Sequence, residues 1–564
     1  MAEISRRDFM RAAGLAAAGG CGLLLKGCAS KTSWDVVIKD GLVVDGLGTP
    51  GRVADIGIVG DAIVRIGRIP SAGGAMVISA RGMVVAPGFI DVHNHTDTAI
   101  LVNPRAESDI RQGVTTIVAG QCGDSPFPLS DMMFEEEEKR LREEYGLVLS
   151  WHDIRGFYTR IDKAGTALNF ASFVGQGTVR AAAMGYGDRK PEPAELALMK
   201  KLVANSMAGG AFGISTGLEY APGGFSPTEE LIEVCRAAAP YQGMYATHMR
   251  DEEAFVVEAV DEAIRIARES GLPLQISHLK TGYVRNWPKL GTILGRIEAA
   301  RSAGLDVFCD RYPYIASATG LDMYFPLWAR EGKTEAFLQR LQDPALRKKL
   351  AAYVESQEAN LGSWDKVLIS GVDTEKNKGL EGVSVLEASR KANKTPYDFM
   401  KDLLIEENDR VGIVQFAMSE DNLKTLMAHP LVGVGSDGSA LAPYGPLGKG
   451  KPHPRSYGAF PRALGTYVRE DKLLPIEAMI KKMTSIPAAR FGFTRRGVLQ
   501  AGNFADIVVF DPDKVRDKAT WADPHQYPEG IPHVLVNGKV VIRDGEHTGD
   551  LPGVVLRKGG PETA

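Results

Sequence analysis

The strongest constraint on the fold is a repeating pattern of short apolar strands and longer helical stretches between about residues 87 and 497. Eight segments have the length, apolar content and flanking turn residues of buried strands. They lie at about 83–90, 115–120, 169–174, 213–215, 244–247, 273–277, 307–310 and 432–435. Helical stretches between them include 195–208, 228–238, 252–270 and 290–303. Repeated strand–helix units of this length predict an α/β fold, a (β/α)8 barrel of the TIM type.

Short β runs with tight turns occupy both ends of the chain outside this region. Residues 34–86 and 498–556 both show the pattern, and the second segment contains Asn537-Gly538, a hairpin signal. Two β segments that flank one long middle predict a small β-sandwich domain built from both termini. The barrel domain then spans 87–497. A stretch rich in charge and helix, at about 321–410, is interpreted as an insertion between the seventh and eighth strands, in a position to cover the site.

The first 30 residues have the pattern of an export signal. Ser5-Arg-Arg-Asp-Phe-Met10 is a twin-arginine pattern, and an Ala- and Gly-rich apolar run follows at 12–25. That run is too short to span a bilayer, so we interpret 1–30 as a twin-arginine signal that directs export to the periplasm. Leu25-Lys-Gly-Cys28 is similar to a lipoprotein cleavage box, although lysine fits the box poorly. Membrane anchoring through a lipidated Cys28 therefore stays open.

Composition excludes some partners. Hydrophobic residues make up 44% and charged residues 24% of the chain, which is typical of a globular protein. The formal net charge is −4, and no basic stripe with interleaved aromatic residues is present in the sequence. We therefore expect a small-molecule partner and no nucleic acid.

Two histidines lie at the carboxyl end of the first barrel strand, in the segment Gly88-Phe-Ile-Asp-Val-His-Asn-His-Thr-Asp97. Side chains two apart along a strand point to the same face, so His93 and His95 present two imidazoles to one place. Neutral imidazole is a common ligand of divalent metals. Taken alone, however, a His-x-His pair is as typical of two solvated loop histidines.

Other metal-type side chains follow other strands. Cys122 comes after the second strand, His248 after the fifth, His278 after the sixth and Asp437 after the eighth. Singly, a cysteine or histidine at such a position is more typical of a buried core residue. Together they fall at the carboxyl ends of barrel strands, where such barrels carry their catalytic groups. Nitrogen and sulfur ligands suit Zn²⁺, which activates water, and a nearby carboxylate can take the proton of that water.

These motifs resemble the amidohydrolase superfamily and, more narrowly, the D-aminoacylase (N-acyl-D-amino-acid deacylase) family. The resemblance extends from about Trp34 to the C-terminal β segment. The residues that carry it are Gly-Phe-Ile-Asp-x-His-x-His, the cysteine after the second strand, Thr247-His-Met-Arg, Ser277-His-Leu-Lys and Gly435-Ser-Asp-Gly. It implies that Cys122, His248 and His278 hold a tight Zn²⁺. It also implies that His93 and His95 complete a second, weaker site with Cys122. Asp437 would be a metal ligand and the general acid/base.

The resemblance also implies which residues bind substrate: Lys280, Tyr220, Tyr312, Arg455 and Ser317. An N-acyl amino acid carries a free α-carboxylate, which the guanidinium of Arg455 can hold with two parallel bonds. Two features depart from the family pattern. The stretch 438–452 is longer than expected before Arg455, and the motif around Ser317 matches only approximately.

The resulting hypothesis is zinc-dependent hydrolysis of the amide bond of N-acyl-D-amino acids. Metal-bound water would be the nucleophile, and Asp437 would protonate the leaving amine. A metallodipeptidase or a cyclic amide hydrolase on the same barrel is the alternative, although Lys280 and Arg455 favour an acyclic substrate with a carboxylate. A binding protein without catalytic activity is a third possibility, which the retained ligand set and Asp437 argue against.

Overall fold

The computed structural model describes residues 33–561, so the twin-arginine pattern and Cys28 lie outside the described residues. Its centre is the barrel that the strand–helix pattern predicted. The strands are β6 (Phe89–Asp91), β7 (Val114–Ala119), β8 (Asn169–Ser172) continued by β9 (Val174–Gly175), β10 (Gly213–Gly217), β11 (Met244–His248), β12 (Leu274–Ile276), β13 (Val307–Arg311) and β17 (Val432–Val434). Neighbours pair in parallel. The circle closes where Asn94 bridges Gly438.

Helices surround the barrel and cover its strands. They are α2 (Ala99–Val102), α3 (Glu107–Ile110), α4 (Asp131–Tyr145), α5 (Ile154–Ala164), α6 (Gln176–Met184), α7 (Pro193–Ala208), α8 (Thr228–Arg236), α9 (Val256–Ser270), α10 (Leu290–Ser302), α15 (Glu420–Ala428), α16 (Arg455–Arg462), α17 (Ile476–Met483) and α18 (Ser485–Phe491). In α9, buried residues recur at Val256, Val260, Ala263 and Ala267, which is the spacing of one helix face. That apolar face packs on β12 and on the neighbouring helices α8 and α10.

The prediction that one helix begins at Glu252 is wrong, because α9 begins four residues later, at Val256. The side chain of Asp251 accepts hydrogen bonds from the backbone N–H groups of Glu253 and Phe255, at 2.7 and 2.8 Å. Such a local side-chain bond competes with helical hydrogen bonding and holds a turn. Glu252 therefore lies in the loop after β11 instead of on a helix.

Strands from both ends of the chain form one nine-stranded sheet beside the barrel. They are β1 (Val36–Val43), β2 (Arg52–Val59), β3 (Ala62–Gly67), β4 (Met76–Ser79), β5 (Val84–Pro87), β18 (Ile507–Phe510), β19 (His533–Val536), β20 (Lys539–Arg543) and β21 (Glu546–His547). Antiparallel pairing of β5 with β18 joins the two ends. Apolar residues of both halves, such as Ile38, Ile56, Ile507 and Leu535, share one core. The β domain built from both termini is thus confirmed.

A further unit lies between β13 and β17 and has its own core. Its three-stranded sheet has the order β14 (Ala316–Gly320), β16 (Gly412–Phe416), β15 (Val367–Gly371), all antiparallel. Its helices are α11 (Thr334–Gln342), α12 (Arg347–Leu361), α13 (Val385–Lys391) and α14 (Pro396–Glu406). Buried Trp364, Phe325 and Leu350 belong to this core. We call residues 316–416 the outer unit.

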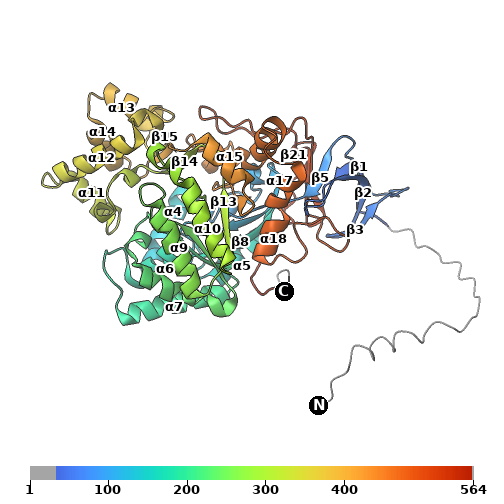
Figure 1. Cartoon of the computed structure of the whole chain (residues 1–564), viewed down its shortest axis with the longest axis horizontal. Coiled ribbons are helices and arrows are strands. Elements are labelled where there is room, and N and C mark those ends of the chain that lie inside the picture. The colour runs from blue at the N-terminus through green and yellow to red at the C-terminus, as the bar shows by residue number, and fades with distance from the viewer. Residues whose placement is uncertain (1–32, 562–564) are drawn as a thin grey trace, which may run out of the picture.

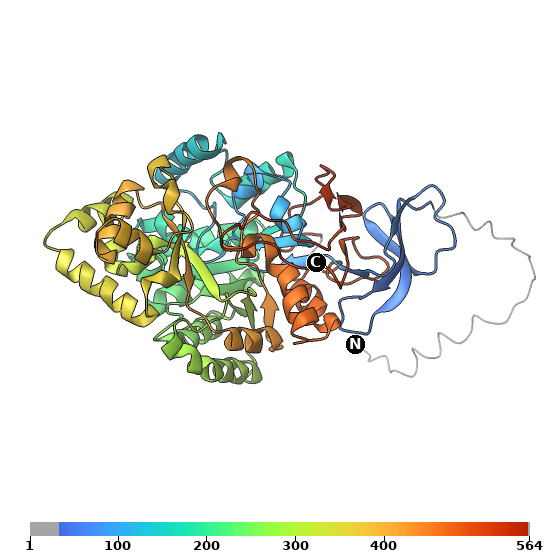
Figure 2. The same ribbon diagram turned by 90° about the horizontal axis from the view of Figure 1, so that it is seen from above.

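The three parts lie in a row. Figures 1 and 2 show the outer unit, with α11 to α14, at one end, the strands β1 to β3 at the other, and the barrel between them. Within the described residues, no helix combines the length and apolar character needed to cross a membrane.

Candidate metal centre and substrate cavity

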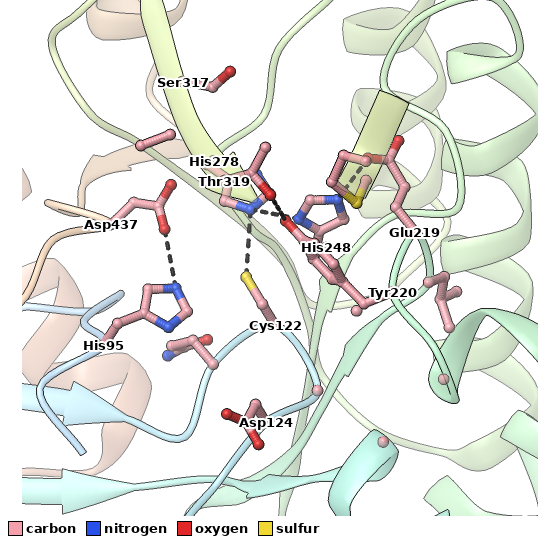
Figure 3. Close-up of a pocket in the computed structure, with 18 of the residues that line it drawn as sticks. His95, Cys122, Asp124, Glu219, Tyr220, His248, His278, Ser317, Thr319 and Asp437 are labelled. Atoms are coloured by element: carbon pink, nitrogen blue, oxygen red, sulfur yellow. Dashed lines mark hydrogen bonds and ion pairs between the residues drawn. The ribbon is translucent and has the colours of Figure 1, made fainter. Parts of the chain in front are cut away.

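The polar residues that follow the barrel strands converge at one end of the barrel. His93 and His95 follow β6, Cys122 follows β7, His248 ends β11, His278 follows β12 and Asp437 follows β17. In Figure 3, Cys122 lies between His95 on one side and His248 and His278 on the other, with Asp437 next to His95. The carboxyl ends of the strands therefore bring all six side chains together, and five of them line one cavity, with His93 buried behind.

Three of these residues have an unusual backbone conformation. Cys122, His278 and Asp437 have φ values of 52°, 37° and 52°, in the left-handed region that few non-glycine residues adopt. Gly123 follows Cys122 with φ 79°, and a Cβ there would lie 2.5 Å from the backbone nitrogen of Gly217. Only glycine fits this position. Conformations of this kind concentrate at functional sites, where the surrounding structure imposes them.

One group of ligand atoms consists of Cys122, His248 and His278. The Sγ of Cys122 lies 3.5 Å from Nε2 of His278, and Nδ1 of His248 lies 3.0 Å from the same nitrogen. Two ligand atoms on a tetrahedral zinc, with bonds of about 2.0–2.3 Å, lie roughly 3.3–3.8 Å apart. The 3.5 Å spacing lies within this range and the 3.0 Å spacing lies just below it, so the group is close to the arrangement that holds one small divalent ion.

A second group shares Cys122 and adds His93, His95 and Asp437. Nε2 of His93 lies 3.5 Å from the Sγ of Cys122 and 3.3 Å from Oδ1 of Asp437. Nε2 of His95 lies 3.1 Å from the same carboxylate oxygen. Because Cys122 belongs to both groups, its thiolate could serve as a ligand in each.

The electrostatics of the cluster demand positive charge. Burial disfavours charge on the Cys122 thiol, but His93 and His278 lower its pKa well below the usual range. Burial likewise disfavours the His95 imidazolium, yet Asp437 and Cys122 raise the pKa of His95 to about 10. A buried thiolate and carboxylate thus hold extra protons on neighbouring imidazoles. A divalent cation would supply the same positive charge and release these nitrogens as ligands.

Three of the four ligand histidines have a carboxylate beside their other ring nitrogen, and the sequence pattern alone did not reveal these carboxylates. Asp310 lies 3.1 Å from Nδ1 of His93, Glu219 lies 3.2 Å from Nε2 of His248, and Glu252 lies 2.9 Å from Nδ1 of His278. Outer carboxylates of this kind fix the tautomer and orientation of metal-binding histidines. Asp310 ends a predicted strand, a signal that could have revealed it, whereas Glu219 and Glu252 carry no such signal.

All five expected substrate-binding residues line a single cavity of about 1630 Å³. The structure places Lys280, Tyr312 and Arg455 near Asp437 and His278, whereas Ser317 lies on β14 of the outer unit. Tyr220 packs against His248, with ring centroids 4.9 Å apart, and burial raises the pKa of Tyr220 to about 12. The outer unit also contributes Tyr324, Tyr353, Gln357 and Gln415 to the cavity wall.

Arg455 contacts the carboxylate of Asp437 despite the long preceding loop. Its Nη1 lies 2.7 Å from Oδ2 of Asp437, and both side chains are 8% exposed. The buried His453 accepts a hydrogen bond from the Arg455 N–H at 3.0 Å, and its Nε2 lies 2.9 Å from the carbonyl oxygen of Ala316. His453 thereby fixes the start of α16. The guanidinium also lies over the ring of Tyr312, 4.8 Å from its centroid.

Comparison with known proteins identifies relatives over nearly the whole chain. The sequence model of the Amidohydrolase family matches residues 76–542. D-aminoacylase of Alcaligenes xylosoxydans xylosoxydans is 37% identical over 525 residues, which cover 93% of this chain and 98% of that protein.

Two solved structures are similar over the same extent. N-acyl-D-glutamate deacylase of Bordetella bronchiseptica, complexed with zinc and a phosphonate mimic of the tetrahedral intermediate, has a TM-score of 0.79 at 33% identity. A D-aminoacylase structure that concerns the role of its binuclear metal centre has a TM-score of 0.78 at 36% identity. Each match covers 93% of this chain and 100% of the other.

Proposed function

This chain belongs to the amidohydrolase family, and from that premise we propose that it hydrolyses the amide bond of N-acyl-D-amino acids. The products are a carboxylic acid and a D-amino acid. The observation that carries the proposal is the position of Asp437, which contacts two ligand histidines through one oxygen and Arg455 through the other. Asp437, a proton acceptor, is thus fixed between the ligand histidines and Arg455, a cation suited to bind an α-carboxylate.

We propose zinc as the metal, with Cys122, His248 and His278 as the tight site and His93, His95, Cys122 and Asp437 as a second, weaker one. The mixed sulfur and nitrogen donors suit zinc, and zinc occurs in the related deacylase. When bound, the ion supplies a Lewis acid for the amide carbonyl and lowers the pKa of water to about 7.

The protein's own residues orient substrate and move the proton. Lys280, Tyr312 and Arg455 hold the α-carboxylate, which positions the scissile amide next to Asp437. Asp437 takes a proton from the attacking water. It then gives that proton to the amide nitrogen as the C–N bond breaks, so that one water is consumed and no other reactant is needed. Arg455 lowers the pKa of Asp437 well below its usual range against the effect of burial, so the carboxylate starts as a base.

A hydrolysis screen tests the proposal. Purified, zinc-loaded protein would be given paired N-acetyl D- and L-amino acids with apolar, acidic and basic side chains, together with dipeptides and hydantoins. We expect turnover confined to N-acyl-D-amino acids, and a loss of about 10²–10⁴-fold in kcat for Asp437→Asn, the usual contribution of a positioned acid/base. Cleavage of dipeptides or hydantoins instead would assign one of the alternative activities.

We further propose that the protein is exported by the twin-arginine route to the periplasm. The support is the sequence of residues 1–30, with its paired arginines and apolar run. Replacement of both Arg6 and Arg7 by lysine should keep the protein in the cytoplasmic fraction. If Cys28 is lipidated, Cys28→Ala should move the exported protein from the membrane fraction to the soluble periplasmic fraction.

A further inference from the structure

Glu252 contacts both a metal ligand and a substrate-binding residue. Its Oε1 lies 2.9 Å from Nδ1 of His278, and its Oε2 accepts a hydrogen bond from the ammonium of Lys280. The three side chains are at most 8% exposed. Among the described residues, Oε1 is a buried acceptor without a hydrogen-bond partner of good geometry. A buried carboxylate oxygen of this kind requires a donor, and His278 is beside it.

The tautomer of His278 decides what Glu252 does. Nε2 of His278 faces Cys122 at 3.5 Å and His248 at 3.0 Å, so this nitrogen must present its lone pair when a metal is bound. The ring proton is then on Nδ1. Lys280 lies 2.8 Å from Nδ1 but cannot donate to a protonated nitrogen. Metal binding therefore leaves Glu252 as the acceptor for both Nδ1 of His278 and the ammonium of Lys280.

We propose that Glu252 is a positioning residue that couples the metal centre to recognition of the substrate carboxylate. The proposal rests on the proposed function of the site. One oxygen fixes the imidazole of His278 for metal binding. The other fixes the ammonium of Lys280, whose remaining N–H groups are available to the α-carboxylate in the cavity. Loss of this carboxylate should therefore weaken both functions at once.

Glu219 offers a matched comparison, because it contacts a metal ligand without contacting Lys280. Its Oε2 lies 3.2 Å from Nε2 of His248, whose Nδ1 faces the metal group. Glu219, His248 and Glu252 also lie close enough together to suggest an ion site of their own. The outward nitrogens of two ligand histidines already account for both carboxylates, so we assign them to orientation of these ligands.

The test compares Glu252→Gln with Glu219→Gln by two measurements. The first is zinc affinity without substrate, by competition with a chromogenic chelator, and it does not depend on activity. The second is KM at saturating zinc for an N-acetyl-D-amino acid and for its carboxamide, which lacks the α-carboxylate. Circular dichroism checks folding, and Glu252→Asp, which keeps the charge, serves if Glu252→Gln does not fold.

We expect both variants to bind zinc about 10–100-fold more weakly, the usual effect of losing an outer carboxylate. Only Glu252→Gln should also change substrate recognition. In that variant, KM for the N-acetyl-D-amino acid divided by KM for its carboxamide should rise by at least about tenfold. Equal KM ratios in the two variants, or unchanged zinc affinity of Glu252→Gln, would overturn the proposal. Loss of a zinc equivalent would instead favour the separate ion site. If the wild type cleaves neither compound, the proposed function fails, whereas the zinc affinities still report on Glu252.

Discussion

Replacement of Arg455 by methionine tests how this site recognises its substrate. The guanidinium is buried, and the ion pair with Asp437 occupies one end of it. The rest of the group can offer one or two bonds to a substrate carboxylate, and a hydrogen bond to a charged group contributes about 1.5–3 kcal/mol. Loss of about 2–4 kcal/mol corresponds to a fall of roughly 30–1000-fold in kcat/KM.

Most of this fall should appear in KM. The α-carboxylate keeps its charge throughout the reaction, so Arg455 binds the ground state and the transition state alike, and such uniform binding sets KM. Steady-state kinetics with an N-acetyl-D-amino acid and its carboxamide measure the effect. Arg455→Lys should give an intermediate KM, because lysine keeps the charge but not the planar fork.

A matched control lies on the same helix. Arg462 pairs with Asp517 at 3.3 Å and does not line the cavity, so Arg462→Met should leave KM within about twofold. If Arg455→Met lowered kcat with unchanged KM, Arg455 would act only through Asp437, and the inferred contact with the substrate carboxylate would be wrong.

Two further predictions concern metal content and stability. Cys122→Ser should lower the amount of bound zinc, measured by metal analysis after gel filtration, because Cys122 belongs to both ligand groups. It should also lower kcat by more than about 100-fold. Full metal content in this variant would contradict the role of Cys122. Burial and nearby Asp322 raise the pKa of Asp409 to about 7, so its ionisation costs stability increasingly as pH rises from about 4 to 7. Asparagine tolerates the φ of 68° at this position. The advantage of Asp409→Asn over the wild type in free energy of unfolding should therefore grow by about 1–2 kcal/mol between pH 5 and pH 8, a figure that already includes a discount for partial exposure. A gain in unfolding midpoint that does not change with pH would refute this origin.

The barrel and the nature of its mouth could be predicted because both depend on local sequence. Buried strands are short apolar runs, and a residue placed just after such a run lies at the carboxyl end of the barrel. His93, Cys122, His278 and Asp437 could be found in this way, without knowledge of packing. The structure brings them within ligand distance of one another, a result that spacing along the chain does not determine.

Two of the outer carboxylates, Glu219 and Glu252, could not be predicted because their roles depend on which way an imidazole faces. Glu252 was assigned to a helix, but hydrogen bonds to the Asp251 side chain hold a turn there, so the helix begins only at Val256 and Glu252 lies in a loop facing His278. The sheet of the outer unit was missed for a different reason. β14 has the sequence Ala-Ser-Ala-Thr-Gly, without apolar alternation, and its partner β16 lies almost 100 residues further along the chain.

The ion pairs in the cavity bear on the choice between linear and cyclic substrates. Lys280 and Arg455 are nearly buried, and each already has a carboxylate partner, Glu252 and Asp437. These partners limit the large cost of burying a cation. A substrate α-carboxylate that enters between Lys280 and Arg455 adds a third charge of the right sign, whereas a cyclic amide would cover both cations without providing one. The remaining N–H donors of the two cations thus favour acyclic amides with a free carboxylate over hydantoins, whereas the pairs keep the cations buried before substrate binds.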